Sequence, residues 1–95
     1  MPAYIIFTRE KTTDQAEMDV YNGLAGATLA EHPAEVLAFY GKQAVLEGPA
    51  HEGAVVVKFP TLEAARAWYD SPAYQNAVKH RHAGSDYRVF IVEGV

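Results

Sequence analysis

The most constraining feature of this sequence is a set of three short segments that are apolar on both alternating faces. The segments are AYIIFTR (Ala3 to Arg9), AVVVKF (Ala54 to Phe59) and YRVFIVE (Tyr87 to Glu93), and their β-branched and aromatic residues predict strands. A sheet with one face in water should alternate apolar with polar residues along each strand. These segments do not alternate in this way; in AVVVKF only Lys58 is polar. The chain should therefore fold so that both faces of its sheet are covered.

A long first helix is predicted between the first two strands. Thr12 followed by Gln15 resembles a capping box, which would start the helix near Thr13. The helix should run to about Glu31 and stop before Pro33, because the residue before a proline avoids the α region. The residues expected on its inward face have the i, i+3, i+4 and i+7 spacing and are Tyr21, Leu24, Ala25 and Thr28.

The middle of the chain predicts a second strand and a loop. Glu35 to Tyr40 (EVLAFY) has the composition of a strand, and Gly41-Lys42 would turn or bulge it into the short apolar piece Ala44 to Leu46. Gly48-Pro49 and Gly53 are typical of a loop.

A broken helix is predicted between the last two strands. Thr61 is a suitable N-cap, and Glu63 lies in the first turn, where the helix dipole favours an acid. Ser71-Pro72 would interrupt and restart the helix, since serine is a good N-cap and proline suits the first helical position. Gly84 would end the helix as a left-handed C-cap. The predicted order is β-α-β-β-α-β.

This order predicts an α+β fold with both helices on one face of an antiparallel sheet, because crossover connections are right-handed. The other face of the sheet would remain apolar, and such a patch is larger than a soluble monomer normally exposes. A second copy of the sheet, related by a two-fold axis, is the simplest cover. We therefore expect a homodimer whose sheets pack face to face.

Composition narrows the class of protein. With 95 residues, 49% of them hydrophobic, the chain is expected to be one domain spanning residues 1–95. The absence of cysteine excludes a disulfide framework, thiolate zinc sites and a cysteine nucleophile. The net charge of −4 and the absence of a basic block argue against nucleic-acid binding. No apolar run approaches the ~20 residues of a membrane helix and no signal peptide is recognisable, so we expect a soluble, cytoplasmic protein.

The second half of the broken helix carries the most unusual candidate residue. One face of this helix contains Tyr74, Ala77, Val78 and Arg81. Arg81 thus shares the stripe of the core-facing residues, and a buried guanidinium needs a carboxylate, a carbonyl or a ligand anion. Arg81 would therefore bind an anion, pair with an acid such as Glu47 or Glu93, or cap the last carbonyls of its helix.

Other chemistry-bearing residues have structural alternatives. Trp68 suits core packing as well as a ligand wall. Ser71 suits a helix cap better than a nucleophile, because no His–acid pair is placed to activate it. His80 and His82 are two apart on a helix, so they face different directions and cannot both bind one metal ion. No histidine on a core face suits haem, and no nucleotide-binding fingerprint occurs, so we expect no metal and no cofactor.

The stretch VVVKFPTLEAARAWYDSPAYQNAVKHR, with the upstream LEG and the closing VFIVEGV, resembles the family called domain of unknown function 1330 (DUF1330). The matching positions are Tyr21, Glu47-Gly48, Phe59-Pro60, Ala64 to Tyr69, Ser71 to Tyr74, and Arg81. The chain departs from the family at two places. It has His32-Pro33-Ala34 where the family often has Gly-Gly, and Lys58 where the family often has Glu.

The resemblance implies the dimeric α/β-barrel (ferredoxin-like) superfamily, with a βαββαβ chain, two helices on one face of the sheet, and a dimer. It supplies no reaction. Relatives in the superfamily include cofactor-independent monooxygenases, which use the cleft between the helices and the concave side of the sheet. Transfer of their chemistry to this chain would be fold-level analogy alone.

Two hypotheses from different classes follow. In the first, the cleft binds, and as an enzyme would transform, a small organic metabolite with an anionic group. The candidate ligand-binding residues are Tyr21, Glu47, Trp68, Ser71, Tyr74 and Arg81. Arg81 would hold the anionic group, and Glu47 would orient Arg81 or act as a base if desolvation raised its pKa. In the second hypothesis, the chain is a non-catalytic dimeric binding or structural module, in which the same residues pin the broken helix to the sheet.

Overall fold

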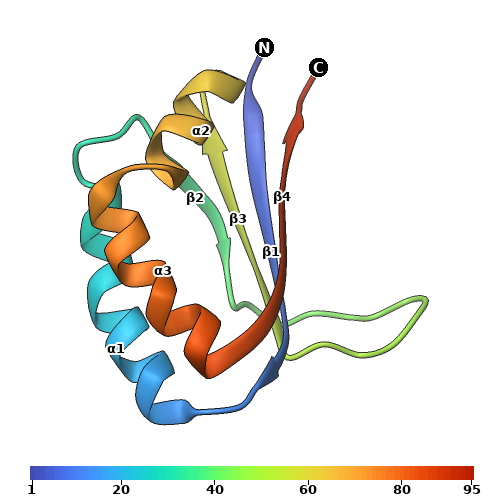
Figure 1. The fold of residues 1–95 in the computed structure, drawn as a ribbon. Coiled ribbons are helices and arrows are strands. Elements are labelled where there is room, and N and C mark those ends of the chain that lie inside the picture. The colour runs from blue at the N-terminus through green and yellow to red at the C-terminus, as the bar shows by residue number, and fades with distance from the viewer.

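Four antiparallel strands form one sheet in the computed structural model, which describes all residues 1–95. The strands are β1 (Ala3–Thr12), β2 (Glu35–Phe39), β3 (Gly53–Phe59) and β4 (Ser85–Glu93), in the order β2-β3-β1-β4 across the sheet. The helices are α1 (Gln15–Ala25), the 3-10 helix η1 (Gly26–Leu29), α2 (Leu62–Tyr69) and α3 (Pro72–Gly84). All of the helices lie on one face of the sheet (Figure 1). The predicted α+β, ferredoxin-like βαββαβ fold is confirmed.

The core lies between the helices and the sheet face that they cover. Ile5 of β1 pairs with Val57 of β3 and with Ile91 of β4, so these three side chains point to the same face. Ile5 and Val57 are buried, together with the other inward residues of β1 and β3. The helices contribute Met18, Tyr21, Ala65, Trp68, Tyr74, Ala77 and Val78 to this core.

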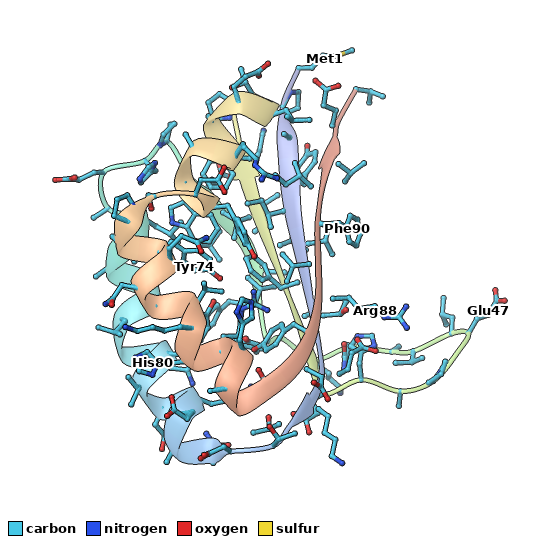
Figure 2. All side chains as sticks on the ribbon, in the orientation of Figure 1. Met1, Glu47, Tyr74, His80, Arg88 and Phe90 are labelled. Carbon is cyan, nitrogen blue, oxygen red and sulfur yellow. The ribbon has the colours of Figure 1, made fainter.

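No element of the chain covers the opposite face of the sheet. Phe90 and Val92 of β4 are 52% and 45% exposed, and Figure 2 shows Phe90 pointing away from the helices. Tyr4 and Ile6 of β1 pair with Val92 and Phe90, so they lie on this same face, where they are half-buried. The apolar outer face that the strand pattern predicts is therefore present.

The first helix begins two residues later than predicted, and the predicted capping box of Thr12 and Gln15 is wrong. Thr12 is the last residue of β1, because after a bulge this strand continues to pair with β4. Its hydroxyl donates to Glu52 Oε1 at 2.6 Å instead of capping the helix. Asp14 is the N-cap, and its carboxylate accepts hydrogen bonds of 3.1 and 3.3 Å from the backbone N–H groups of the first turn.

The same helix also ends earlier than predicted. The α-helical part stops at Ala25, and the tighter η1 carries the chain only to Leu29 rather than to Glu31. Gly23 and Gly26 lower the helix propensity of this segment, which favours a weak end.

The inward face of α1 is centred on Met18 and Tyr21, which are both buried. Leu24 is 37% exposed, so the expectation that it faces inward is wrong. Ala25 and Thr28 are half-buried at the edge of this face.

The start of each half of the broken helix is confirmed. Thr61 Oγ1 accepts a hydrogen bond of 3.0 Å from the backbone N–H of Ala64. Ser71 Oγ accepts one of 3.3 Å from the backbone N–H of Tyr74, and Pro72 occupies the first helical position.

The end of α3 differs from its prediction. Gly84 is not left-handed, since Gly48 (φ 86°) is the only glycine with a positive φ. The carbonyl of Gly84 accepts hydrogen bonds from the backbone N–H groups of Thr13 (2.8 Å) and Asp14 (3.0 Å). A Cβ at Gly84 would lie 2.8 Å from the carbonyl oxygen of Asp14 and 2.9 Å from Glu17 Cβ. Glycine is needed here for close approach to the start of α1.

Residues 41–52 form an arm that projects from the end of the sheet, on the side away from the helices (Figure 1). We call this segment the β2–β3 arm. The apolar piece Ala44 to Leu46 belongs to the arm and does not join the sheet. Across the arm, Gln43 Nε2 donates to the carbonyl of His51 at 2.9 Å. At its base, the backbone N–H of Glu52 donates to the carbonyl of Arg9 at 2.7 Å.

Candidate functional site

An apolar cavity of about 290 Å³ lies between α1–η1 and the β2–β3 half of the sheet. Ten of the twelve residues that line it are hydrophobic, and Asn22 is one of the few polar ones. The cavity opens toward the edge of the sheet at β2, where Val36 and Phe39 are 46% and 68% exposed. A mostly apolar cavity with a few polar groups is the usual form of a small-molecule site.

Small side chains create this cavity. Ala25 and Gly26 lie at the junction of α1 and η1, and both line the cavity. A Cβ placed on Gly26 would have no heavy atom within 4 Å, so the space beside it is empty. Every residue of β2 is exposed, since no helix packs closely on this edge strand.

Trp68 forms one wall of the cavity and is held in place on several sides. Its Nε1 donates to Thr28 Oγ1 at 3.0 Å, and the Thr28 hydroxyl in turn donates to the carbonyl of Ala25 at 2.6 Å. Its ring packs against Tyr74 and Phe59, with centroid distances of 4.1 and 5.8 Å. Trp68 is 3% exposed, so it is both a core residue and a cavity wall.

Tyr21 and Tyr74 join α1 to α3 through their hydroxyl groups, which are 2.8 Å apart. Tyr21 lines the cavity, whereas Tyr74 lies behind it between α3 and the sheet (Figure 2). Burial, and then the proximity of Tyr74, raise the pKa of Tyr21 well above its ordinary value. Burial also raises the pKa of Tyr74, although the Tyr21 hydroxyl and the charge of Arg81 oppose the rise. Both hydroxyls therefore remain protonated, and one of them donates its proton to the bond between them.

A second tyrosine pair joins β2 to β4. The hydroxyls of Tyr40 and Tyr87 are 2.5 Å apart, and Tyr40 lines the cavity. Burial and the hydrogen bond with Tyr40 raise the pKa of Tyr87. Tyr40 has a positive φ of 51°, which is uncommon for a residue other than glycine. Gly53 allows the Tyr40 ring to lie there, because a Cβ on Gly53 would come within 2.6 Å of that ring.

Two arginines flank the second tyrosine pair. The guanidinium carbon of Arg9 lies 4.8 Å from the centre of the Tyr40 ring, and that of Arg81 lies 4.8 Å from the centre of the Tyr87 ring. Arg9 Nε also lies 3.1 Å from Glu52 Oε1, an ion-pair distance without hydrogen-bond geometry.

Arg81 is 3% exposed and has no carboxylate within ion-pair distance. Its Nε makes no hydrogen bond. The residue does not line the apolar cavity; it lines an open polar hollow of about 410 Å³ beside β4, together with His82, Ser85, Asp86 and Tyr87. The predicted pairing of Arg81 with Glu47 or Glu93 is absent within the chain, so the guanidinium has a tyrosine ring as its partner instead of an acid.

The structure brings together four of the six predicted ligand-binding residues: Tyr21, Trp68, Tyr74 and Arg81. Ser71 lies next to them, but its hydroxyl donates to the carbonyl of Trp68 at 2.7 Å and caps α3, so it is already engaged. Glu47 lies at the tip of the β2–β3 arm, far from the other five (Figure 2).

Tyr40 and Tyr87 lie at these hollows but are not among the residues predicted from the sequence. Tyr87 could have been found, since it alternates with Val89 and Ile91 and so falls on the inward face of its strand. Tyr40 gave no such signal, because its direction depends on a positive φ at the end of β2.

The histidines of α3 have structural roles or lie at the surface. His80 Nδ1 lies 2.7 Å from Glu17 Oε2, which links α3 to α1. No three side chains of the His, Asp or Glu type come together as metal ligands. None of the helices combines the length and the apolar character that a membrane crossing requires.

Comparison with protein families gives one result. The model of the family described as "Domain of unknown function (DUF1330)" matches residues 2–95. No curated protein sequence matches the chain.

Solved structures with the same fold are more numerous. A protein of unknown function from Rhodopseudomonas palustris has a TM-score of 0.77 at 18% identity, over 99% of this chain and 82% of that one. A dimeric ferredoxin-like protein of unknown function from Thermobifida fusca has a TM-score of 0.66 at 16% identity, over 97% and 90%. SnoaB, a cofactor-independent oxygenase from Streptomyces nogalater, has a TM-score of 0.56 at 15% identity, over 99% and 91%. Three of the similar structures are described as dimeric ferredoxin-like proteins.

Proposed function

Because the chain belongs to the DUF1330 family, whose description names no activity, we propose a function from its own site: binding of a small, largely apolar organic molecule in the cavity between α1–η1 and β2–β3. The observation that carries this proposal is the apolar lining, interrupted by the tyrosines Tyr21 and Tyr40. An engineered cavity of about 150 Å³ holds benzene. A cavity of about 290 Å³ therefore suits a molecule of one or two rings.

The tyrosine pairs favour a ligand with a carbonyl, enol or phenol oxygen. Each hydroxyl can donate one hydrogen bond and accept two, so Tyr21 and Tyr40 retain capacity after pairing with Tyr74 and Tyr87. Arg81 lies beyond the tyrosines rather than in the lining, so its charge would act on the ligand through them. A neutral ligand that can develop negative charge on oxygen fits this arrangement better than a permanent anion.

If the bound molecule is transformed, the same groups would stabilise negative charge developing on its oxygen. SnoaB, which has a similar fold, is a cofactor-independent oxygenase. This similarity indicates that the fold is compatible with enzyme activity, but it assigns no particular reaction to this chain.

The working unit in this proposal is a homodimer with the outer sheet faces packed together. The exposed Phe90 and Val92 and the dimeric similar structures support it.

Filling the cavity tests the binding proposal. Ala25→Phe should occupy the cavity, whereas Ala27→Phe places the same ring on an exposed position of η1 that does not line it. Gly26→Leu is a second filling variant, since Gly26 has helical φ and ψ of −60° and −41° and free space beside it. The probes are 1-naphthol, a neutral phenol of two rings, and benzoate, a small anion.

We expect 1-naphthol to raise the melting temperature of the wild type and of Ala27→Phe, and to have no effect on Ala25→Phe or Gly26→Leu. Benzoate should have a weaker effect than 1-naphthol. Equal stabilisation of the folded filling variants would contradict binding in this cavity.

The alternative is a structural module without a ligand. The observation that favours it is that both tyrosine pairs and Ser71 already have partners inside the chain. In that case neither probe, nor any member of a library of small carbonyl and phenol compounds, should shift the melting temperature of the wild type.

A further inference from the structure

The β2–β3 arm leaves the molecule on the side of the uncovered sheet face (Figure 1). Its base is held by the hydrogen bonds of Glu52 to Arg9 and Thr12. Its tip turns at Gly48, whose φ of 86° suits glycine, and Leu46 beside the tip is 90% exposed. An arm with a fixed base and an apolar tip in water lacks a contact partner.

The arm is long enough to pass a second sheet. Residues 41–52 run out and back, so about six extended residues at roughly 3.3 Å each give a reach of about 20 Å. Sheets that pack face to face are about 10 Å apart. In the proposed dimer, the tip therefore reaches beyond the sheet of the partner, to the level of that subunit's helix-facing side.

On the helix-covered face of each sheet, the charged guanidinium of Arg81 has no carboxylate to pair with. Arg81 is buried in its own chain, its Nε is without a partner, and it faces an open hollow beside the edge strand β4. Asp86 also lines that hollow, but it does not lie within ion-pair distance of Arg81. Glu47 is an exposed acid with no ion pair, and it lies at the tip of the arm (Figure 2). Arg81 of the same chain belongs to α3, which lies on the other side of the sheet (Figure 1).

We propose that the arm of each protomer wraps around the other and that the partner subunit's Glu47 pairs with Arg81, which closes the polar hollow beside β4. The polar hollow that Arg81 lines beside β4 would then be closed only in the dimer. The arm's Leu46 loses its exposure in the same contact. This inference rests on the proposed homodimer.

A disulfide trap tests the contact, and the chain suits it because it contains no cysteine. His82 is exposed and lines the hollow next to Arg81. A disulfide requires Cα atoms about 4.4–6.8 Å apart. Within one chain, Glu47 lies at the tip of the arm, whereas His82 belongs to α3 on the other side of the sheet, so we expect no intramolecular disulfide. Mild oxidation of Glu47→Cys/His82→Cys should therefore give a covalent dimer on a non-reducing gel. The controls, Glu47→Cys alone and Glu47→Cys/Glu31→Cys, should remain largely monomeric on the gel.

Light scattering on the same samples separates the two proposals. A dimer in solution without a cross-link in Glu47→Cys/His82→Cys overturns the arm contact and leaves the sheet-face dimer standing. A monomer in solution overturns both.

A second measurement concerns the charge itself. Glu47→Gln should lower the melting temperature by several degrees, whereas Glu31→Gln, at another exposed acid without an ion pair, should not. In an Arg81→Met background, Glu47→Gln should have no further effect, because the pair is already broken. Additive losses would contradict the pairing.

Discussion

Gly84 sets how closely α3 can approach the start of α1, because its missing side chain leaves room for backbone atoms. Replacement by alanine would place a Cβ 2.8 Å from the carbonyl oxygen of Asp14, which is backbone and cannot rotate away. We expect Gly84→Ala to lower the free energy of unfolding by about 1–3 kcal/mol, as overpacked sites do. Gly23→Ala is the matched control, since nothing lies within 4 Å of its Cβ position. That substitution should stabilise α1 by about 0.5–1 kcal/mol. Urea unfolding of both variants measures the difference, and equal effects would contradict the close-approach explanation.

Two buried tyrosines and one half-buried tyrosine make stability depend on alkaline pH. The pKa values of Tyr21, Tyr74 and Tyr87 are raised in the folded chain above the unfolded value near 10. Their contribution to stability is therefore fully present below about pH 10 and is lost as the pH rises toward the folded values. In a titration followed by tyrosinate absorbance, part of the signal should appear only with unfolding. A full signal from all six tyrosines in a chain that is still folded would be inconsistent with the buried pairs.

At the residue scale, helical spacing brought together the candidate residues of the two helices. It placed Tyr74 and Arg81 on one face of α3 and Tyr21 on the inward face of α1, and these residues do lie together. Spacing could not show that Arg81 has an aromatic ring as its partner, because Tyr87 comes from a strand whose position depends on the whole sheet. It could not place Glu47 either, since the direction of a loop depends on the fold at its base.

Among the elements, α2 and η1 are joined by one partly buried hydrogen bond, which Trp68 donates to Thr28. Thr28→Val keeps the shape of the side chain but leaves the indole N–H of Trp68 without an acceptor. An unsatisfied buried donor costs about 1–3 kcal/mol, so the melting temperature should fall. Thr28→Ser keeps the hydroxyl and should lie between this variant and the wild type. A Thr28→Val protein as stable as Thr28→Ser would show that the bond contributes little.

Element boundaries could be predicted where a cap is local and not where it depends on distant pairing. Thr61 and Ser71 cap α2 and α3 with their own side chains, so short-range sequence was sufficient. Thr12 has the same local appearance, yet its hydroxyl binds Glu52, forty residues away. Thr12 therefore belongs to strand β1, and Asp14 is the N-cap of helix α1.

For the whole molecule, the outer sheet face should decide the oligomeric state. Phe90→Glu places a charge in the proposed interface, where burial of an unpaired carboxylate is unfavourable. We expect it to shift the protein from dimer to monomer in light scattering. Leu24→Glu changes an exposed leucine on α1 and should leave the dimer intact. A wild-type monomer, or a Phe90→Glu dimer, would rule out the sheet-face interface.

The fold and the uncovered face could be predicted because both follow from the same short segments. The strands are apolar on both faces of the sheet, but the helices cover only one face. The fold leaves the other face exposed, as the strand pattern predicts. The family resemblance is confirmed over residues 2–95. The arm could not be predicted, since Ala44 to Leu46 has the composition of a strand but no neighbouring strand to pair with.

Trp68 is the only tryptophan in the chain, and it stands in the wall of the cavity with its indole nitrogen bound to Thr28. The tryptophan fluorescence of the protein therefore comes from one ring at one place. A molecule that enters the cavity changes the surroundings of that ring, and so changes the emission of the unlabelled protein. Ligand screening by fluorescence therefore needs no dye, and a change in the emission of Trp68 reports on the surroundings of the cavity wall.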